Sequence, residues 1–227
     1  MKNVEFDFYV DHIASFLKEN PSGNYKDALD NGVNFIELNL GKEITITEWI
    51  KNQNFDESTI VIEEGARVKE SEYGIKILAD EINTWANENN IKELNIFLPS
   101  GTGTTALFLQ KNIPFNVYTC ACVGRSEYLA EQFNDLNSSL DIYPKIIEPP
   151  RRYHFGKLYR ENFELYNELK EQTGIEFDLL YDPVGWSTLL DAINSNSIDT
   201  SIPMLYIHQG GINGNKTMIE RYERKYL

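Results

Sequence analysis

Short apolar runs rich in β-branched and aromatic residues recur along the chain, with helix-like patterns between them. Several of these runs are apolar at nearly every position, which is typical of strands buried on both faces of a sheet. In the helix-like segments, apolar side chains return every three or four residues, as on one face of an α-helix. Strands that alternate with helices predict parallel βαβ units, so we expect an α/β fold with a parallel twisted sheet and flanking helices. The predicted strands are residues 6–10, 33–38, 58–62, 93–98, 115–123, 145–148, 177–181 and 203–208, and the predicted helices are residues 71–89, 105–111, 125–137, 157–172, 185–193 and 216–226.

The charge balance narrows the classes of partner. The 227 residues carry 21 Lys and Arg against 35 Asp and Glu, a formal net charge of −14. Nucleic-acid binding and docking on anionic lipid both need a basic surface, so we expect neither nucleic acid nor membrane as a partner. No apolar run is long enough to span a bilayer, and Glu5, Asp7 and Asp11 interrupt the first apolar segment, unlike a secretory signal. We therefore expect a cytoplasmic protein.

Cysteine and histidine usage points to neither a disulfide nor a metal. Cys120 and Cys122 lie two residues apart in a β-rich run, where their side chains point the same way and a bridge between them is awkward. We expect a reduced, buried pair of small apolar residues. The three histidines, His12, His154 and His208, are far apart, and none has cysteine or carboxylate neighbours at metal-ligand spacing. No metal site is predicted.

A loop rich in glycine and threonine interrupts the sequence NIFLPSGTGTTALFL at residues 95–109. It is not a P-loop, because no Gly-Lys-Ser/Thr follows its glycines. It also departs from the dinucleotide-binding fingerprint, because Ala106 stands at the third glycine position. The acidic residue expected about twenty positions further on is missing as well.

What remains is a strand, a loop and the start of a helix, an arrangement that suits an anion. Backbone N–H groups at a helix N-terminus point toward such a ligand, and the helix dipole favours negative charge. Gly101 and Gly103 allow close approach of the backbone, while Thr102, Thr104 and Thr105 can donate hydroxyl hydrogen bonds. From the residue types alone, a capped strand–helix turn without a ligand is an equal alternative.

The loop and its neighbours resemble pyridoxal 5'-phosphate (PLP) enzymes of the tryptophan-synthase-β fold, PLP fold type II. Within that fold they look most like the 1-aminocyclopropane-1-carboxylate (ACC) deaminase and D-cysteine desulfhydrase branch. Three further segments resemble elements of this branch, in the same order along the chain. They are EEGARVKESEYGIKILADEI (63–82), which precedes the loop, GIEFDLLYDPVGWSTLL (174–190), with its Asp-Pro-Val, and LYIHQGGINGN (205–215), with its His-x-Gly-Gly.

The resemblance implies that the loop holds the phosphate of PLP and that the two later motifs lie beside the cofactor. Two departures affect the expected chemistry. Gly185 and Trp186 follow the Asp-Pro-Val where the deaminases have Tyr and Glu, and Gln209 precedes the paired glycines where the desulfhydrase pattern has Thr. Gln209 can still hydrogen-bond a ring nitrogen, as donor or acceptor. The cofactor-binding residues implied by position are Ser100, Gly101, Thr102, Gly103, Thr104, Thr105, Asp182, His208, Gln209 and Gly210.

The lysine that PLP chemistry needs is not found in its expected place. In the family it lies in a Gly-Asn-Lys motif upstream of the phosphate loop, followed by a Ser-Asn segment that grips the substrate carboxylate. Residues 1–99 contain neither motif, and GNYK (23–26) has Tyr25 where the lysine should be. Lys216 follows a Gly-Asn pair, but it comes after the loop, so we expect an exposed residue in the first turn of the last helix.

The simplest hypothesis is an N-terminally truncated enzyme. Residues 1–60 would be a remnant of the small domain, and residues 61–227 the large domain that binds the PLP phosphate. The family resemblance implies a deaminase or desulfhydrase, a lyase or hydrolase acting on a small amino acid such as ACC or D-cysteine. The alternatives are a non-catalytic remnant that binds PLP or phosphate, one part of a split enzyme, or an unrelated α/β protein with an anion loop. Expected partners are the small amino-acid substrate and either a second copy or an upstream polypeptide that carries the lysine.

Overall fold

The computed structural model describes residues 4–41 and 44–226. The chain forms two compact units. The first contains Met1–Val61 together with Asn213–Arg221, and the second contains Ile62–Ile212 together with Tyr222–Leu227. The assignment of these parts as a small-domain remnant and a cofactor-binding domain stays a prediction.

The first unit has a two-stranded parallel sheet. β1 (Asp7–Val10) pairs with β2 (Asn34–Glu37), with Phe8 opposite Phe35. Three short helices accompany them: α1 (Ser15–Glu19), α2 (Gly23–Asp30) and α3 (Ile46–Lys51). None of the three was predicted, because segments of five to eight residues are too short to show a clear helical period. The last helix, α9 (Asn215–Tyr226), begins in this unit and ends in the second.

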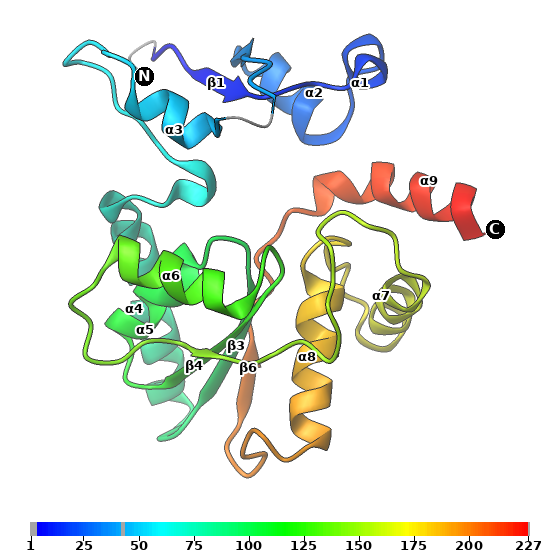
Figure 1. Cartoon of the computed structure of the whole chain (residues 1–227). Helices are drawn as coiled ribbons and strands as arrows, with labels where there is room; N and C mark the ends of the chain where they lie inside the picture. Colours follow the sequence, from blue (N-terminus) through cyan, green and yellow to red (C-terminus); the bar gives the residue numbers. More distant parts are fainter. Residues whose placement is uncertain (1–3, 42–43, 227) are drawn as a thin grey trace. The chain divides into compact units, whose positions relative to one another are not determined.

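The second unit is built on a four-stranded sheet in the order β5-β4-β3-β6, with every pair parallel (Figure 1). This confirms the predicted α/β architecture. Its strands are β3 (Asn95–Ser100), β4 (Asn116–Ala121), β5 (Lys145–Ile146) and β6 (Met204–Tyr206). Its helices are α4 (Glu72–Glu88), α5 (Thr104–Asn112), α6 (Ser126–Leu136), α7 (Arg160–Thr173) and α8 (Asp182–Asn194), with short 3₁₀ turns at η1 (Glu64–Ala66), η2 (Lys69–Ser71) and η3 (Ile212–Gly214).

Alternate residues of the central strands pack into two separate hydrophobic cores. Ile96 and Leu98 of β3 pack with α4, α5 and α6 on one face of the sheet, whereas Phe97 packs with α8 on the other. Figure 1 shows the same layers, with α7 lying beside α8. Both faces are therefore covered, which explains the continuous apolar runs of β3 and β4. Cys120 and Cys122 are free thiols buried in the α8-side core, as predicted.

Two predicted strands are wrong. Residues 58–62 form no strand, and Ile60 is 84% exposed there, so its apolar side chain does not mark a buried element. Residues 177–181 form bends instead of a strand. The carboxylate of Asp178 accepts hydrogen bonds from the backbone N–H groups of Leu180 and Tyr181, which would otherwise be available to a sheet ladder.

Candidate functional site

The candidate site lies at the carboxyl edge of the four-stranded sheet. Ser100 at the end of β3 is paired with Ala121 at the end of β4, and β6 runs parallel to β3 on its other side. The glycine-rich loop follows β3 at this edge, and the segment with His208 and Gln209 follows β6. Gln209 is hydrogen-bonded to Pro99 of β3, and His208 contacts Asp182 at the start of α8. In open parallel sheets, ligands bind outside the carboxyl ends of the strands.

Gly103 fixes the geometry of the loop. It caps α5 with φ of 79°, a left-handed conformation that favours glycine. A Cβ at this position would lie 2.4 Å from the Phe133 ring and 2.7 Å from Leu129, so α6 closes the space behind it. Leu107 N–H donates to the Gly103 carbonyl, which leaves the N–H groups of the three preceding helical residues without partners inside α5. These amides are available to an anion.

The hydroxyls of the loop divide into two groups. Ser100 Oγ lies 2.6 Å from Thr119 Oγ1, and both residues are buried, so this pair joins β3 to β4 beneath the loop. Thr102 Oγ1 and Thr104 Oγ1 form the second group and lie 3.2 Å apart. Thr105 follows in the first turn of α5 and is half-buried. The predicted phosphate-binding residues are therefore together, with Ser100 engaged in holding the base of the loop.

Gly65 belongs to the site, although only the segment around it was singled out from the sequence. It has φ of 70° within η1, and a Cβ there would lie 2.2 Å from Thr102 Oγ1. The η1 turn thus packs directly on the loop and restrains Thr102. From the other side, a Cβ on Gly101 would lie 3.3 Å from the Tyr181 ring. Tertiary contacts of this kind leave no periodic signal in a sequence.

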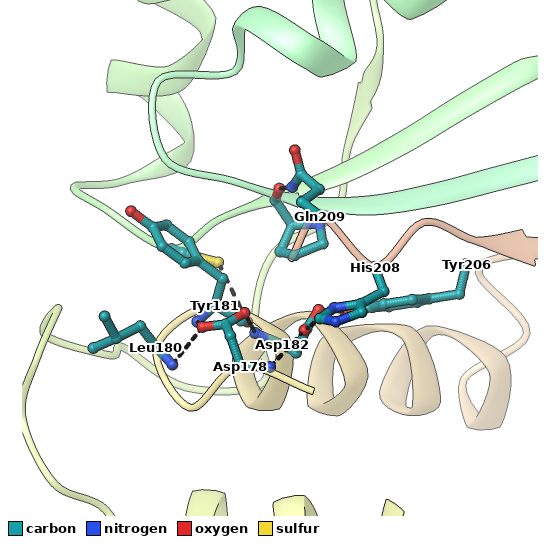
Figure 2. A network of polar contacts seen from close by, with 9 residues as sticks. Asp178, Leu180, Tyr181, Asp182, Tyr206, His208 and Gln209 are labelled. Atoms are coloured by element: carbon teal, nitrogen blue, oxygen red, sulfur yellow. Dashed lines mark hydrogen bonds and ion pairs between the residues drawn. The ribbon is translucent and has the colours of Figure 1, made fainter. Parts of the chain in front are cut away.

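Asp182 lies behind the loop and is completely buried. Its Oδ1 accepts a hydrogen bond of 2.7 Å from the Tyr206 hydroxyl, and its Oδ2 lies 2.8 Å from His208 Nδ1 (Figure 2). The backbone N–H of Asp178 also donates to Oδ2, at 3.0 Å. With these three partners, Asp182 positions the His208 ring and does not itself line an open surface. Asp182 would therefore contribute to cofactor binding indirectly, by positioning His208.

Asp178 and Asp182 form a reciprocal pair at the start of α8, each carboxylate accepting a hydrogen bond from the other's backbone N–H. Burial, followed by the charge of Asp182, raises the pKa of Asp178 to about 6. Burial and the same neighbouring charge also raise the pKa of Tyr206 well above its ordinary value. The pair therefore concentrates negative charge next to the imidazole of His208.

Aromatic rings enclose this network. Trp186 stacks on Tyr206 with ring centroids 4.3 Å apart, and Phe177 meets the His208 ring edge-on at 5.1 Å. Offset and edge-to-face contacts of this kind add to the area that each ring buries. Trp186 thus has a packing role here, although the sequence marked it only as a departure from the deaminase pattern.

The segment after β6 reaches back to the loop. Gln209 Nε2 donates a hydrogen bond to the Pro99 carbonyl, immediately before Ser100 (Figure 2). That bond uses one of the two N–H donors of the amide, so the carbonyl Oε1 and the second N–H of Gln209 remain for a ligand. Gly210 follows with φ of 81° and an exposed position. His208 and Gln209 are therefore held at the same edge as the loop.

Other candidate groups lie elsewhere. Lys216 is exposed in the first turn of α9, as expected. Among residues 4–41 and 44–226, no three His, Cys, Asp or Glu side chains gather in a way that could hold a metal ion. Over the same residues, no helix combines the length and the apolar character needed to cross a bilayer.

The fold is that of the tryptophan-synthase-β-like class. A solved structure described as an ACC deaminase homologue superposes with a TM-score of 0.69, covering 97% of this chain and 69% of that one, at 17% identity. The predicted fold class is therefore confirmed, and with it the parallel sheet whose carboxyl edge carries the loop.

The sequence also has a distant curated relative, a putative mitochondrial D-cysteine desulfhydrase 2 of Oryza sativa subsp. japonica. The two are 23% identical over 190 residues, which is 74% of this chain and 46% of the relative. No family model matches the chain. The chain is thus similar, at a distance, to proteins described as a D-cysteine desulfhydrase and an ACC deaminase homologue, in line with the resemblance that its motifs predicted. It spans less than half the length of the curated relative.

Proposed function

We propose that the chain binds PLP through its glycine-rich loop and forms the phosphate-binding part of a deaminase or desulfhydrase acting on a small amino acid such as ACC or D-cysteine. One observation carries the proposal: the first turn of α5, behind the left-handed Gly103, offers backbone amides beside the hydroxyls of Thr102 and Thr104. A phosphate dianion matches that donor set and the positive end of the helix dipole. The relatives named above support the choice of PLP as the phosphate ester.

When bound, PLP supplies an electron sink for carbanions. The residues of this chain have separate tasks around it. The α5 amides and the two threonine hydroxyls hold the phosphate, and the Ser100–Thr119 pair keeps the loop base in place. Gln209 hydrogen-bonds the ligand through Oε1 or through its second Nε2–H, because the first is bonded to Pro99. Tyr181, against Gly101, bounds the site on the side of α8.

Paired isosteric substitutions test the phosphate site. Thr102→Val with Thr104→Val removes both hydroxyls at almost constant volume, and we expect a loss of about tenfold or more in PLP affinity, measured by equilibrium dialysis. Thr84→Val is the matched control, because the Thr84 hydroxyl donates to the Asp80 carbonyl on the exposed face of α4. Equal PLP affinity in the double variant and the wild type would overturn the assignment of this loop.

A second candidate is a split enzyme in which an upstream polypeptide brings the lysine. The first unit favours it, because Phe6 and Phe8 are 49% and 48% exposed beside a parallel sheet that has two strands among the described residues. Parallel sheets are normally covered on both faces, and two strands alone are marginal. An added polypeptide would pair with this sheet and cover the two phenylalanines.

Borohydride trapping distinguishes the two candidates. The chain is incubated with PLP, reduced and digested, and modified lysines are identified by mass spectrometry, first alone and then after co-expression with the polypeptide encoded directly upstream. A split enzyme predicts an adduct on a lysine of that second polypeptide. A specific adduct on a lysine of this chain, without the second polypeptide, would contradict the split enzyme and favour activity of the chain alone. An adduct on Lys216 would show that this exposed lysine reacts with PLP and has a functional role.

A further inference from the structure

We propose that Arg67 is a positioning residue for the glycine-rich loop. Its guanidinium fastens the η1 turn to α6, and η1 in turn holds Thr102 where a phosphate would bind. The inference deepens the proposed function and rests on it, since it assigns a further residue to the phosphate-binding part of the same site. It arises from an arginine side chain that is only 16% exposed and that is hydrogen-bonded on two sides.

Arg67 joins two elements that are far apart in the sequence. Its Nε and Nη2 both donate to Glu63 Oε2, at 3.0 and 2.6 Å, across the η1 turn. Its Nη1 donates to Gln132 Oε1 of α6 at 2.7 Å, and Asp135 Oδ2 lies 3.8 Å from the same nitrogen. The planar guanidinium directs N–H groups to both sides at once, which a lysine ammonium does not. Arg67 is therefore a cross-link between η1 and α6.

The turn that Arg67 closes has an unfavourable backbone. Gly65 has φ of 70° and Ala66 follows with φ of 49°, so two consecutive residues lie in the left-handed region. Alanine is disfavoured there, because its Cβ crowds the backbone. The Ser71 hydroxyl donates to the Ala66 carbonyl at 2.6 Å. This bond and the Arg67–Glu63 pair hold the turn in a conformation that its residues do not favour by themselves.

The loop lies against both of the elements that Arg67 joins. On one side, η1 meets Thr102 through Gly65, where an added Cβ would lie 2.2 Å from Thr102 Oγ1. On the other side, α6 meets Gly103 through the Phe133 ring. Without the Arg67 cross-link, η1 would be free to move away from Thr102, whereas α6 would still pack on Gly103.

The charge of Arg67 is already balanced by carboxylates. Glu63 and Asp135 both lie within ion-pair distance of the guanidinium, so it adds little positive potential at the loop. The donors available to a phosphate are the α5 amides and the hydroxyls of Thr102 and Thr104. Arg67 thus influences phosphate binding through the position of Thr102 and is not itself a ligand.

Equilibrium dialysis with PLP tests the inference, and urea unfolding confirms that each variant is folded under the conditions of dialysis. We expect Arg67→Gln to lose about fivefold or more in PLP affinity, because Thr102 is no longer held. Arg67→Lys keeps the charge but cannot bond Glu63 through two N–H groups, so we expect a similar loss. Arg151→Gln is the matched control, because it removes the same charge and an exposed ion pair of 2.6 Å with Glu161. Its affinity should equal that of the wild type.

A double-mutant cycle separates positioning from a general loss of structure. Thr102→Val removes the hydroxyl that Arg67 is proposed to place. In that background, we expect Arg67→Gln to change PLP affinity by less than about twofold. An equal loss with and without the Thr102 hydroxyl would overturn the inference, and so would wild-type affinity in Arg67→Gln or Arg67→Lys.

Two further readouts need no PLP. In ¹H–¹⁵N NMR of the unliganded chain, Arg67→Gln should shift the backbone amide resonances of Thr102 and Thr104, and Arg151→Gln should not. In the wild type, which avoids any question of variant folding, the bonded Arg67 Nε–H should exchange with solvent more slowly than that of Arg151. Unshifted amides or equally fast exchange would defeat the role of Arg67 alone. Absence of PLP binding in the wild type would defeat the proposed function, and the inference with it.

Discussion

At the scale of single residues, Asp178 shows how one carboxylate both shapes the backbone and sets a pH dependence. Its oxygens accept three backbone N–H groups in the turn that leads into α8, so residues 177–181 cannot also form a strand. Its burial beside Asp182 makes ionisation costly. The Asp178 side chain therefore stabilises the turn through its hydrogen bonds, while burial disfavours its ionised form.

Asp178→Asn should change stability in a pH-dependent way. The pKa of Asp178 is raised to about 6 in the folded chain from an ordinary 3.8, so its contribution to stability is present below about pH 4 and is lost as the pH rises through about 6. Asparagine cannot ionise. We therefore expect the free energy of unfolding of the variant, measured with urea, to rise relative to that of the wild type between pH 4.5 and 7.5. The asparagine side chain has one acceptor oxygen where the Asp178 carboxylate has two. We expect the lost hydrogen bonding to lower the free energy of unfolding by the same amount at every pH.

Asp199→Asn is the control for that experiment. The hydroxyl and amide of Ser201 lower the pKa of Asp199, which is therefore ionised over the whole range tested. The stability difference for this variant should not change between pH 4.5 and 7.5. If Asp178→Asn gives an equally flat difference, burial of its carboxylate does not govern the pH dependence.

At the scale of elements, the glycine-rich loop could be predicted from sequence and the turn that supports it could not. A strand, two glycines with neighbouring hydroxyls and a helix start form a local pattern, and β3, Gly103 and α5 reproduce it. By contrast, Gly65 lies 37 residues before Thr102 and meets it through folding alone. The false strand at 177–181 has the converse cause, because an apolar run does not reveal that an aspartate will take its backbone donors.

Gly65→Ala should damage the loop from a distance in sequence. The new methyl group would overlap Thr102 Oγ1, and alanine is strained at φ of 70°. We expect a loss of about 1–3 kcal/mol in the free energy of unfolding, together with weaker PLP binding, measured by urea unfolding and equilibrium dialysis.

Gly74→Ala provides the comparison for Gly65. Gly74 lies inside α4, and no atom stands within 4 Å of an added Cβ. We expect this variant to gain about 0.5–1 kcal/mol from helix propensity and to bind PLP like the wild type. Similar losses in both variants would indicate a general effect of added methyl groups and contradict a specific role for η1.

At the scale of the whole molecule, the alternation of apolar runs predicted the fold class, the central strands and the long helices. It missed α1, α2 and α3, the short helices of the first unit, and assigned an extra strand at residues 58–62. These errors lie in the first unit or at its boundary with the second, whereas the other false strand, at residues 177–181, lies in the second unit, where Asp178 takes the backbone donors. Where burial is partial, as at Ile60, apolar composition is a poor guide to strand formation.

Limited proteolysis should cleave the segment between α3 and η1 first. The segment between the end of α3 at Lys51 and η1 at Glu64 contains no helix or strand, and Ile60, Val61 and Ile62 are exposed there. Thermolysin, which favours bonds before apolar residues, should cut at these positions before it cuts β3 or β4. Mass spectrometry of the first products identifies the site, and early cleavage within residues 95–121 would contradict the division into two units.

The stacking of Trp186 on Tyr206 has a practical consequence for spectroscopy. Of the three tryptophans, Trp186 shares its ring stack with the tyrosine bonded to Asp182, whereas Trp85 is 43% exposed on α4 and Trp49 lies in the first unit. A variant that keeps Trp186 and carries phenylalanine at the other two positions would report on the site through its own fluorescence. The chain thus contains an optical sensor one hydrogen bond away from the Asp182 carboxylate.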